Sequence, residues 1–209
     1  MSNTAILLPH LIQAVATAVN DNAAELTELD RAIGDGDHVD NLQRGIQALL
    51  AISEELGQLD WQQALLKMSM TVMSKIGGAS GSLYGTLFMT MSKSLQNRPL
   101  TPAVFAEIFQ KGVESVKLRG KADKGEKTML DVLIPVSEVL ISHADQADLI
   151  DQIKQAAING AEATRDMVAT KGRASFLGER SRGHIDAGAK SSQLMICAVV
   201  DALNQLNIS

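Results

Sequence analysis

Three aspartates lie close together in the segment 30–41. Asp35 and Asp37 flank a single glycine in the stretch GDGDHVDN, and Asp30 lies five residues upstream. Carboxylates crowded in this way repel one another unless a cation compensates their charge. Mg²⁺ prefers oxygen ligands and keeps coordination positions open for water and phosphate, so an incomplete set of Asp side chains suits it. With Gly36 as the bend, the segment predicts a magnesium site that can hold phosphates.

Two other structures place aspartates at similar spacing. A calcium-binding EF-hand needs an oxygen ligand at the fifth loop position and Glu at the twelfth, but counting from Asp35 these positions hold Val39 and Ile46. The EF-hand is therefore excluded. Helix N-caps and tight turns also favour Asp, and spacing alone does not separate that structural role from a metal site.

A second motif, IGGASGSLYG (76–85), places a glycine cluster ahead of a helical pattern. Backbone N–H groups at such a helix N-terminus can receive phosphate oxygens, and Ser80 adds a hydroxyl donor. Gly77 as a helix C-cap and Ser80 or Ser82 as an N-cap would explain the same residues. Neither G-x-x-x-x-G-K-[ST] nor a strand-linked G-x-G-x-x-G occurs, so a phosphate site here would rely on metal rather than on lysine.

Composition narrows the class of protein. The net charge is −5 and no basic stripe is present, which argues against nucleic acid and against a membrane surface as partners. No leader-like segment or apolar run of spanning length is seen, so we expect a soluble, cytoplasmic protein. Cys197, the only cysteine, lies in an apolar segment and is expected to be buried and inert.

The elements that must position these motifs are helical. The chain is 45% hydrophobic but only 3% aromatic, and no segment alternates apolar and polar residues as a strand would. Apolar residues at helical spacing predict a first helix over 8–19, a long small-residue stripe over 153–168, and a last helix over 195–206. Asp60, Thr101 and Thr128 are suited to N-caps, and Pro102 to a first turn. Further helices are expected near 39–56, 60–75, 81–96, 101–117 and 128–142.

About eight helices result, and we expect an all-α antiparallel bundle forming one domain over residues 1–209. Three connections interrupt it, at 29–38, 119–127 and 171–192. The third exceeds the usual length of loops in compact domains and contains Phe176, Leu177 and Ile185, which can anchor it. We interpret it as a functional loop.

Four segments together resemble one family. They are LDRAIGDGDHVDNLQRG (29–45), GGASGSLYGT (77–86), RGKADKGEKTMLDV (119–132) and KGRASFLGERSRGHIDAGA (171–189), and in order and spacing they are similar to the nucleotide-binding L subunits of dihydroxyacetone kinases. The resemblance extends over nearly the whole chain. It implies a barrel of eight antiparallel helices with the nucleotide bound by loops at one end.

The same resemblance implies the ligands. Asp30, Asp35 and Asp37 would hold two Mg²⁺ ions that grip the diphosphate of tightly bound ADP or ATP. The nucleotide itself would contact His38, Asn41, Gly78, Ala79, Ser80, Gly120, Thr128, Met129, Arg173, Asp186, Ala187 and Gly188. No residue is assigned a certain catalytic role. Lys121, Lys124 and Lys127 are expected to be solvated, and Arg180, Arg182 and His184 to be structural or at the surface.

Two positions depart from the family pattern. Val39 stands where glycine usually follows the histidine, and it could restrict the backbone beside the metal turn. Ala187 replaces a proline, which removes a rigid φ from the covering loop and could loosen nucleotide retention. Neither departure removes a ligand.

In the phosphotransferase-dependent form, the resemblance implies a relay. A phosphohistidine donor of the M type would phosphorylate bound ADP, and the γ-phosphoryl group would pass to dihydroxyacetone on a separate K subunit, giving dihydroxyacetone phosphate. The alternatives are an L-type subunit of an ATP-dependent kinase for another ketose or acyl substrate, and a nucleotide-loaded module that binds a transcription regulator.

Overall fold

The computed structural model describes residues 5–143, 146 and 148–206, and its elements in these ranges are helical. The single-domain range 1–209 therefore includes residues outside the described ones. The α-helices are α1 (Leu8–Asp21), α2 (Ala23–Ile33), α3 (His38–Leu50), α4 (Ser53–Gln58), α5 (Trp61–Lys75), α6 (Gly78–Leu95), α7 (Pro102–Gly120), α8 (Leu130–Ser142), α9 (Leu149–Ala163) and α10 (Ala187–Gln205), with the 3-10 segments η1 (Thr164–Asp166) and η2 (Arg173–Ser181).

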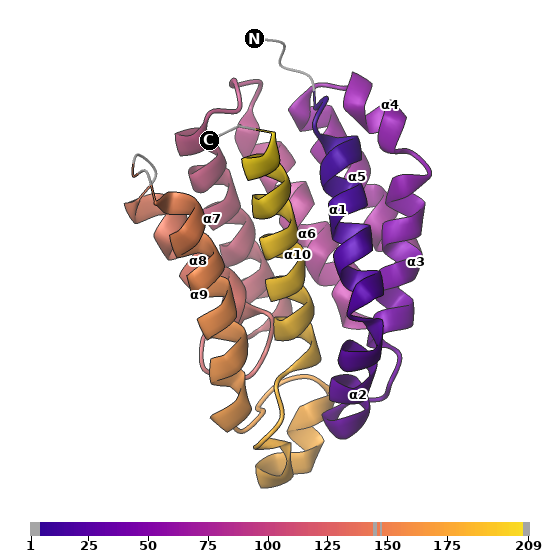
Figure 1. The fold of residues 1–209 in the computed structure, drawn as a ribbon, viewed down its shortest axis with the longest axis vertical. Coiled ribbons are helices and arrows are strands. Elements are labelled where there is room, and N and C mark those ends of the chain that lie inside the picture. The colour runs from indigo at the N-terminus through magenta and orange to yellow at the C-terminus, as the bar shows by residue number, and fades with distance from the viewer. Residues whose placement is uncertain (1–4, 144–145, 147, 207–209) are drawn as a thin grey trace.

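Eight of these helices form a closed ring. In the order α1, α3, α5, α6, α7, α8, α9, α10, each packs against the next, and α10 packs against α1. Neighbours in the ring run in opposite directions, as Figure 1 shows. The expected antiparallel barrel of eight helices is confirmed, and each of the eight is 13 residues or longer. The shorter α2 and α4 lie in connections between ring helices.

Several helix boundaries differ from the sequence expectation. Part of the expected connection 29–38 is the end of α2, and the expected helix 39–56 is divided at residues 51–52, where α3 ends before α4 begins. The last helix begins at Ala187 instead of 195, which shortens the long connection. The small-residue stripe ends with α9 at Ala163, so the apolar residues Met167 and Val168 lie beyond the helix.

The capping residues explain several helix starts. The Asp60 side chain accepts a hydrogen bond from Gln63 N, and the Thr101 side chain accepts one from Val104 N, as predicted. Pro102 occupies the first turn of α7. Small residues let neighbouring helices touch: a β-carbon at Gly160 of α9 would lie 2.2 Å from the Asp131 carbonyl oxygen of α8.

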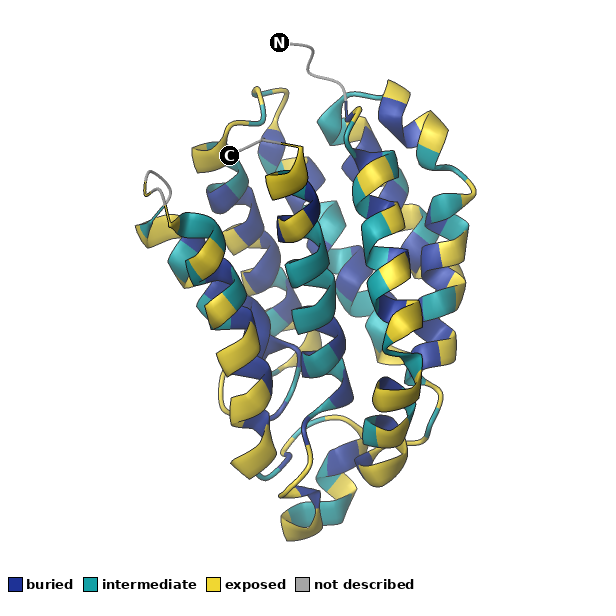
Figure 2. Ribbon diagram, viewed as in Figure 1, coloured by how far each residue is buried: buried dark blue, intermediate teal, exposed yellow. Residues whose placement is uncertain are grey.

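The apolar faces of the ring helices point inward and form the core, drawn dark blue in Figure 2. Leu42, Leu56 and Ile108 are at most 1% exposed, and each such side chain contributes about 1.5–3 kcal/mol by leaving water. Cys197 is half-buried, where full burial was expected. Within the described ranges, no helix is both long and apolar enough to pass through a membrane.

Candidate functional site

All four segments singled out in the sequence meet at one end of the barrel. They overlap the connections 34–37, 76–77, 121–129 and 164–186, which lie at the lower end of the barrel in Figure 1. This convergence follows from the alternating direction of the helices, since every second connection must lie at the same end. Residues as far apart in the sequence as His38 and Ser191, which are 153 positions apart, can therefore form one site.

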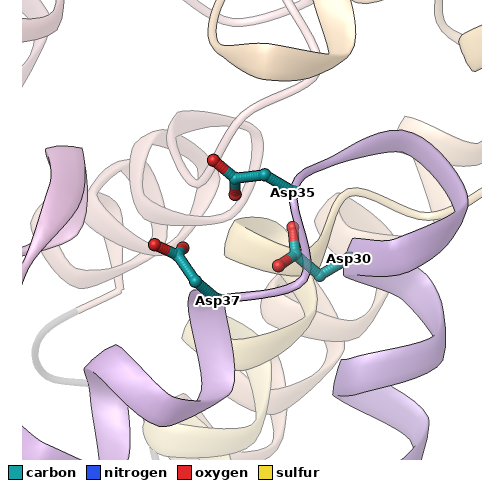
Figure 3. A group of neighbouring side chains, drawn as sticks. All are labelled: Asp30, Asp35 and Asp37. Atoms are coloured by element: carbon teal, nitrogen blue, oxygen red, sulfur yellow. The ribbon is translucent and has the colours of Figure 1, made fainter.

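The three aspartates come together as predicted. One carboxylate oxygen from each of Asp30, Asp35 and Asp37 lies within 4.8 Å of the other two, close enough to share a cation. Asp30 is buried at the end of α2, whereas Asp35 and Asp37 are exposed (Figure 3). Three hard oxygen donors, open on one side, fit Mg²⁺ and leave room for phosphate oxygens.

Two glycines allow this turn. Gly36 has φ +79°, a left-handed conformation that side chains disfavour, and it reverses the chain between the two exposed aspartates. A β-carbon at Gly34 would lie 2.0 Å from Asp30 Oδ1, so only glycine leaves room for that carboxylate. The predicted bend at Gly36 is thus present, and Gly34 contributes equally.

Few protein groups compensate the charge of these carboxylates. Asp30 Oδ2 accepts one hydrogen bond from His38 N at 3.0 Å. Asp35 Oδ2 lies 2.9 Å from Arg173 Nε, but the Arg173 side chain is 72% exposed, so this ion pair is weak. Asp37 is the residue before α3, yet its side chain makes no capping hydrogen bond. The alternative role as N-caps thus explains only a part of the cluster.

His38 is fixed by two serines. Its Nε2 lies 2.9 Å from Ser191 Oγ of α10, and its Nδ1 lies 3.5 Å from Ser80 Oγ of α6. Burial lowers the pKa of the imidazole, and the charges of Asp30 and Asp37 oppose that shift. His38 therefore links three ring helices directly beneath the carboxylates.

The glycine motif lies beside Asn41. Gly78 to Ser80 form the first turn of α6, so the glycines belong to the helix N-terminus and do not merely precede it. A β-carbon at Gly77 would lie 2.5 Å from Asn41 Oδ1, and one at Gly78 would lie 3.8 Å from Asn41 Nδ2. The predicted residues Asn41, Gly78, Ala79 and Ser80 are thus brought together on the carboxylate side.

A second set of predicted contacts gathers around the start of α10, namely Thr128, Met129 and residues 186–188. Asp186 is its N-cap and accepts from Ala189 N at 2.8 Å. A β-carbon at Gly188 would lie 3.8 Å from the nitrogen of buried Met129. Gly120 lies at the end of α7, where an added β-carbon would be 3.5 Å from Cδ2 of Leu83. The predicted contacts at Thr128, Met129 and residues 186–188 thus form a second wall of the same end.

Sequence reasoning missed Asp131, which organises the connection 121–129. This buried carboxylate accepts from Gly125 N at 2.6 Å and from Thr128 N at 2.8 Å, while Thr128 Oγ1 accepts from Leu130 N at 3.1 Å. Thr128 and Asp131 have the spacing of a capping box, [ST]-x-x-[DE], which is the signal that could have revealed this role.

Asp186 differs from the exposed aspartates in its environment. Desolvation raises the pKa of its carboxyl group to about 6, and the hydrogen bond from Ala189 N and the charge of Lys127 only partly oppose this. Its backbone N–H also donates to Thr164 Oγ1 at 3.0 Å. Asp186 therefore holds the junction between η1 and α10.

The expectation that Lys127 is solvated is wrong. This side chain is 1% exposed, and its ammonium donates to the carbonyl oxygens of Thr164 and His184. The burial of this lysine could not be predicted from the sequence, because its neighbours along the chain are polar. Lys121, Lys124, Arg180, Arg182 and His184 are exposed, as predicted.

The two departures from the family pattern are accommodated. Val39 lies inside α3 in helical conformation and packs in a small cluster with Val19 and Leu26. Ala187 is the first residue of α10, a position that suits proline and alanine alike.

The DAK2 domain family matches residues 32–201 of this chain. The chain is 43% identical over 182 residues to "PEP-dependent dihydroxyacetone kinase 1, ADP-binding subunit DhaL" of Listeria innocua, covering 87% of this chain and 88% of that protein. It is 41% identical over 176 residues to "PEP-dependent dihydroxyacetone kinase, ADP-binding subunit DhaL" of Escherichia coli, covering 82% of this chain and 84% of that protein.

Among solved structures, the fold is similar to the dihydroxyacetone kinase of C. freundii in native form, with a TM-score of 0.76 at 22% identity. The match covers 93% of this chain but 34% of that longer chain. The complex of that kinase with AMP-PNP and Mg²⁺ gives a TM-score of 0.75. The family model matches residues 32–201, and the Listeria and Escherichia subunits are 43% and 41% identical to this chain. These two findings show that this chain belongs to the DAK2 domain family.

Proposed function

We propose that this chain is the ADP-binding subunit of a phosphotransferase-dependent dihydroxyacetone kinase. The observation that carries the proposal is the convergence of four separate segments on three carboxylates that can share a cation. The names of the Listeria and Escherichia relatives, which include ADP and the L subunit, support it. We also propose that the chain acts as one domain and in the cytoplasm.

In this proposal the aspartates hold Mg²⁺ and the surrounding residues hold the nucleotide. Asp30, Asp35 and Asp37 would bind two magnesium ions, which neutralise phosphate charge. The N-terminus of α6, at Gly78, Ala79 and Ser80, would add backbone and hydroxyl donors to the phosphates. The remaining contacts would come from His38, Asn41, Gly120, Thr128, Met129, Arg173, Asp186, Ala187 and Gly188.

The bound nucleotide would supply the phosphoryl carrier. A phosphoryl group would move from a histidine nitrogen of the M-type donor to the terminal oxygen of ADP, and then to a hydroxyl oxygen of dihydroxyacetone held by the K subunit. The residues of this chain would fix the phosphates in line and exclude water, which is how positioning lowers such barriers. The hydroxyl proton would leave to a base on the K subunit, which holds the dihydroxyacetone.

Reconstitution tests the proposal. The chain is combined with a K subunit, a phosphohistidine donor, dihydroxyacetone and an amount of ADP far smaller than that of dihydroxyacetone. The amount of dihydroxyacetone phosphate formed is then measured. Product in large excess over ADP is expected. Product that requires free ATP and no donor would favour the ATP-dependent alternative. No product at all, with capture by a transcription regulator, would favour the binding module.

Binding itself is tested with Asp35→Asn. We expect this change to weaken retention of ADP sharply in the presence of Mg²⁺ while helicity stays the same, because the turn holds the metal and the ring holds the fold. Calorimetric titration and circular dichroism measure the two effects. Unchanged retention would remove Asp35 from the proposed site.

A further inference from the structure

Lys127 is the largest fully buried side chain in the described part of the molecule. It lies in the connection 121–129 and its own backbone is left-handed, with φ +62°. Burial lowers the pKa of its ammonium group, an effect that the charges of Asp186 and Asp131 oppose. A buried cation in strained backbone is costly unless its contacts are specific.

The two acceptors of the ammonium flank one segment. Thr164 O and His184 O are the carbonyls immediately before and after residues 165–183, which we call the covering segment. The ends of this segment also bond each other, because Gly183 N donates to Arg165 O at 2.8 Å. The two ends of the covering segment therefore lie side by side, and the Lys127 ammonium group binds the carbonyl oxygen next to each end.

The covering segment has contacts of its own with the site. Its Arg173 reaches Asp35, and Ala169 and Ala174 pack with Ile33 at the end of α2. Internally, Ser181 Oγ accepts from Ala169 N at 2.9 Å and donates to Gly178 O at 2.7 Å. The segment is therefore held together by its own hydrogen bonds, and both of its ends are held beside Lys127.

Lys127 also precedes the second wall of the site. The next two residues are Thr128 and Met129, and Met129 approaches Gly188 of α10. A single side chain thus joins the turn that contains these residues to both ends of the covering segment. Glu126 also joins the two connections. Thr170 N donates to Glu126 O at 3.5 Å, Thr170 Oγ1 donates to Glu126 Oε1 at 3.0 Å, and Lys171 Nζ lies 3.5 Å from the same carboxylate oxygen, but the side-chain hydrogen bond is exposed.

We propose that Lys127 is a positioning residue that holds the covering segment against the nucleotide and so determines how long the nucleotide stays bound. This inference rests on the proposed function, because it requires that ADP binds at this end. Lys127 contacts two backbone carbonyl oxygens, so it would act on the nucleotide through the covering segment. Its loss should therefore speed release while leaving the metal ligands intact.

Lys127→Met tests the inference, because methionine keeps the volume and removes the cation. Fluorescent ADP is loaded with Mg²⁺ and chased with unlabelled ADP, and the dissociation rate is followed. We expect release at least about tenfold faster than in the unchanged chain, the scale of one or two lost hydrogen bonds to a charged group. Association should change much less, since an unfastened segment does not hinder entry.

Two variants and one separate readout distinguish positioning from loss of structure. Lys124→Met removes the same charge from the same connection at an exposed position, and its release rate should stay within about twofold. Lys127→Arg keeps the cation and should release ADP more slowly than the Met variant. A purely structural role would reduce the fraction of molecules that bind, without changing the rate of release from those that do.

Hydrogen exchange on the unchanged chain applies even if Lys127→Met does not fold. With ADP and Mg²⁺ bound, amides in 121–129 and in the covering segment should slow together. The inference is overturned if the covering segment exchanges equally fast with and without bound ADP, or if Lys127→Met folds and releases ADP at the unchanged rate. Failure of the unchanged chain to bind ADP would instead overturn the proposed function, and the inference with it.

Discussion

Two groups of acidic residues at the same end of the barrel have opposite environments. Asp30, Asp35 and Asp37 lie near one another and receive one backbone hydrogen bond and one exposed arginine between them. Asp131 lies in the first turn of α8 and Asp186 is the N-cap of α10, and their oxygens accept three backbone N–H groups, from Gly125, Thr128 and Ala189. The first group has unused oxygens, whereas the second uses its oxygens to shape the chain.

This difference separates ligands from caps. A carboxylate already bonded to backbone amides is occupied by the fold, so its removal should lower stability. A carboxylate crowded by its neighbours and short of donors needs a cation, so its removal should lower metal affinity and relieve repulsion. Proximity in the sequence does not distinguish the two cases. The number of hydrogen-bond donors around each carboxylate oxygen distinguishes them.

The largest effect is expected for Asp131→Ala. It leaves the amides of Gly125 and Thr128 unpaired in a buried turn, so the free energy of unfolding should fall by roughly 2–4 kcal/mol. Urea denaturation measures it. Asp131→Asn retains one acceptor oxygen and should lose less. Full stability in the Ala variant would show that the second group is not structural.

Asp37→Asn should give the reverse pattern. Affinity for ADP with Mg²⁺ should fall by at least about 10- to 100-fold, the range known for groups that merely support a metal ligand. Stability without metal should be unchanged or higher, since one of three crowded charges is removed. Asp40→Asn, an exposed change in the first turn of the same helix, is the matched control. Calorimetric titration measures the affinity for ADP. Equal affinities of the Asp37→Asn and Asp40→Asn variants would contradict the distinction between metal ligands and structural carboxylates.

Asp186→Asn tests the half-buried member of the second group through the pH dependence of stability. The folded carboxyl has its pKa raised from an ordinary 3.8 to about 6, so between about pH 4 and 6 the folded chain holds a proton that the unfolded chain has lost. The free energy of unfolding must therefore decline as pH rises through this window and level off above it. Asn is the suitable replacement because it also caps helices but has no carboxyl group that takes up a proton in this range.

The measurement is the difference between the unfolding free energies of the two chains, followed from pH 4 to 7. The difference should change by on the order of 1 kcal/mol, in the direction that favours the unchanged chain at low pH. A flat difference would show that Asp186 is ionised throughout this pH range.

The smallest effect is expected at the opposite end. Hydrogen bonds from Arg98 and Lys111 lower the pKa of the Glu107 carboxyl to about 2, yet the group is exposed. Glu107→Gln should leave ADP affinity unchanged and lower the melting temperature only slightly, and about 1 M salt should abolish that difference. Weakened ADP binding in this variant would contradict the assignment of function to one end.

Much of the architecture could be predicted from the sequence. Apolar residues at helical spacing predict the ring helices, and Asp60, Thr101 and Pro102 mark two of their starts, because caps and periodicity are local properties. The division between α3 and α4 was missed because the apolar pattern continues through it. The start of α10 was missed because 187–192 is small and polar, although Asp186 is a good N-cap.

The sequence by itself determined the helices, the acidic turn around Gly36 and the resemblance based on four segments, since each depends on residues close together along the chain. Only the tertiary structure decided which carboxylates remain unpaired, that His38 lies between Ser80 and Ser191, and that Lys127 is buried. Burial and hydrogen-bond partners come from segments far apart in the chain, and the ring places those segments at one end. No local pattern encodes that placement.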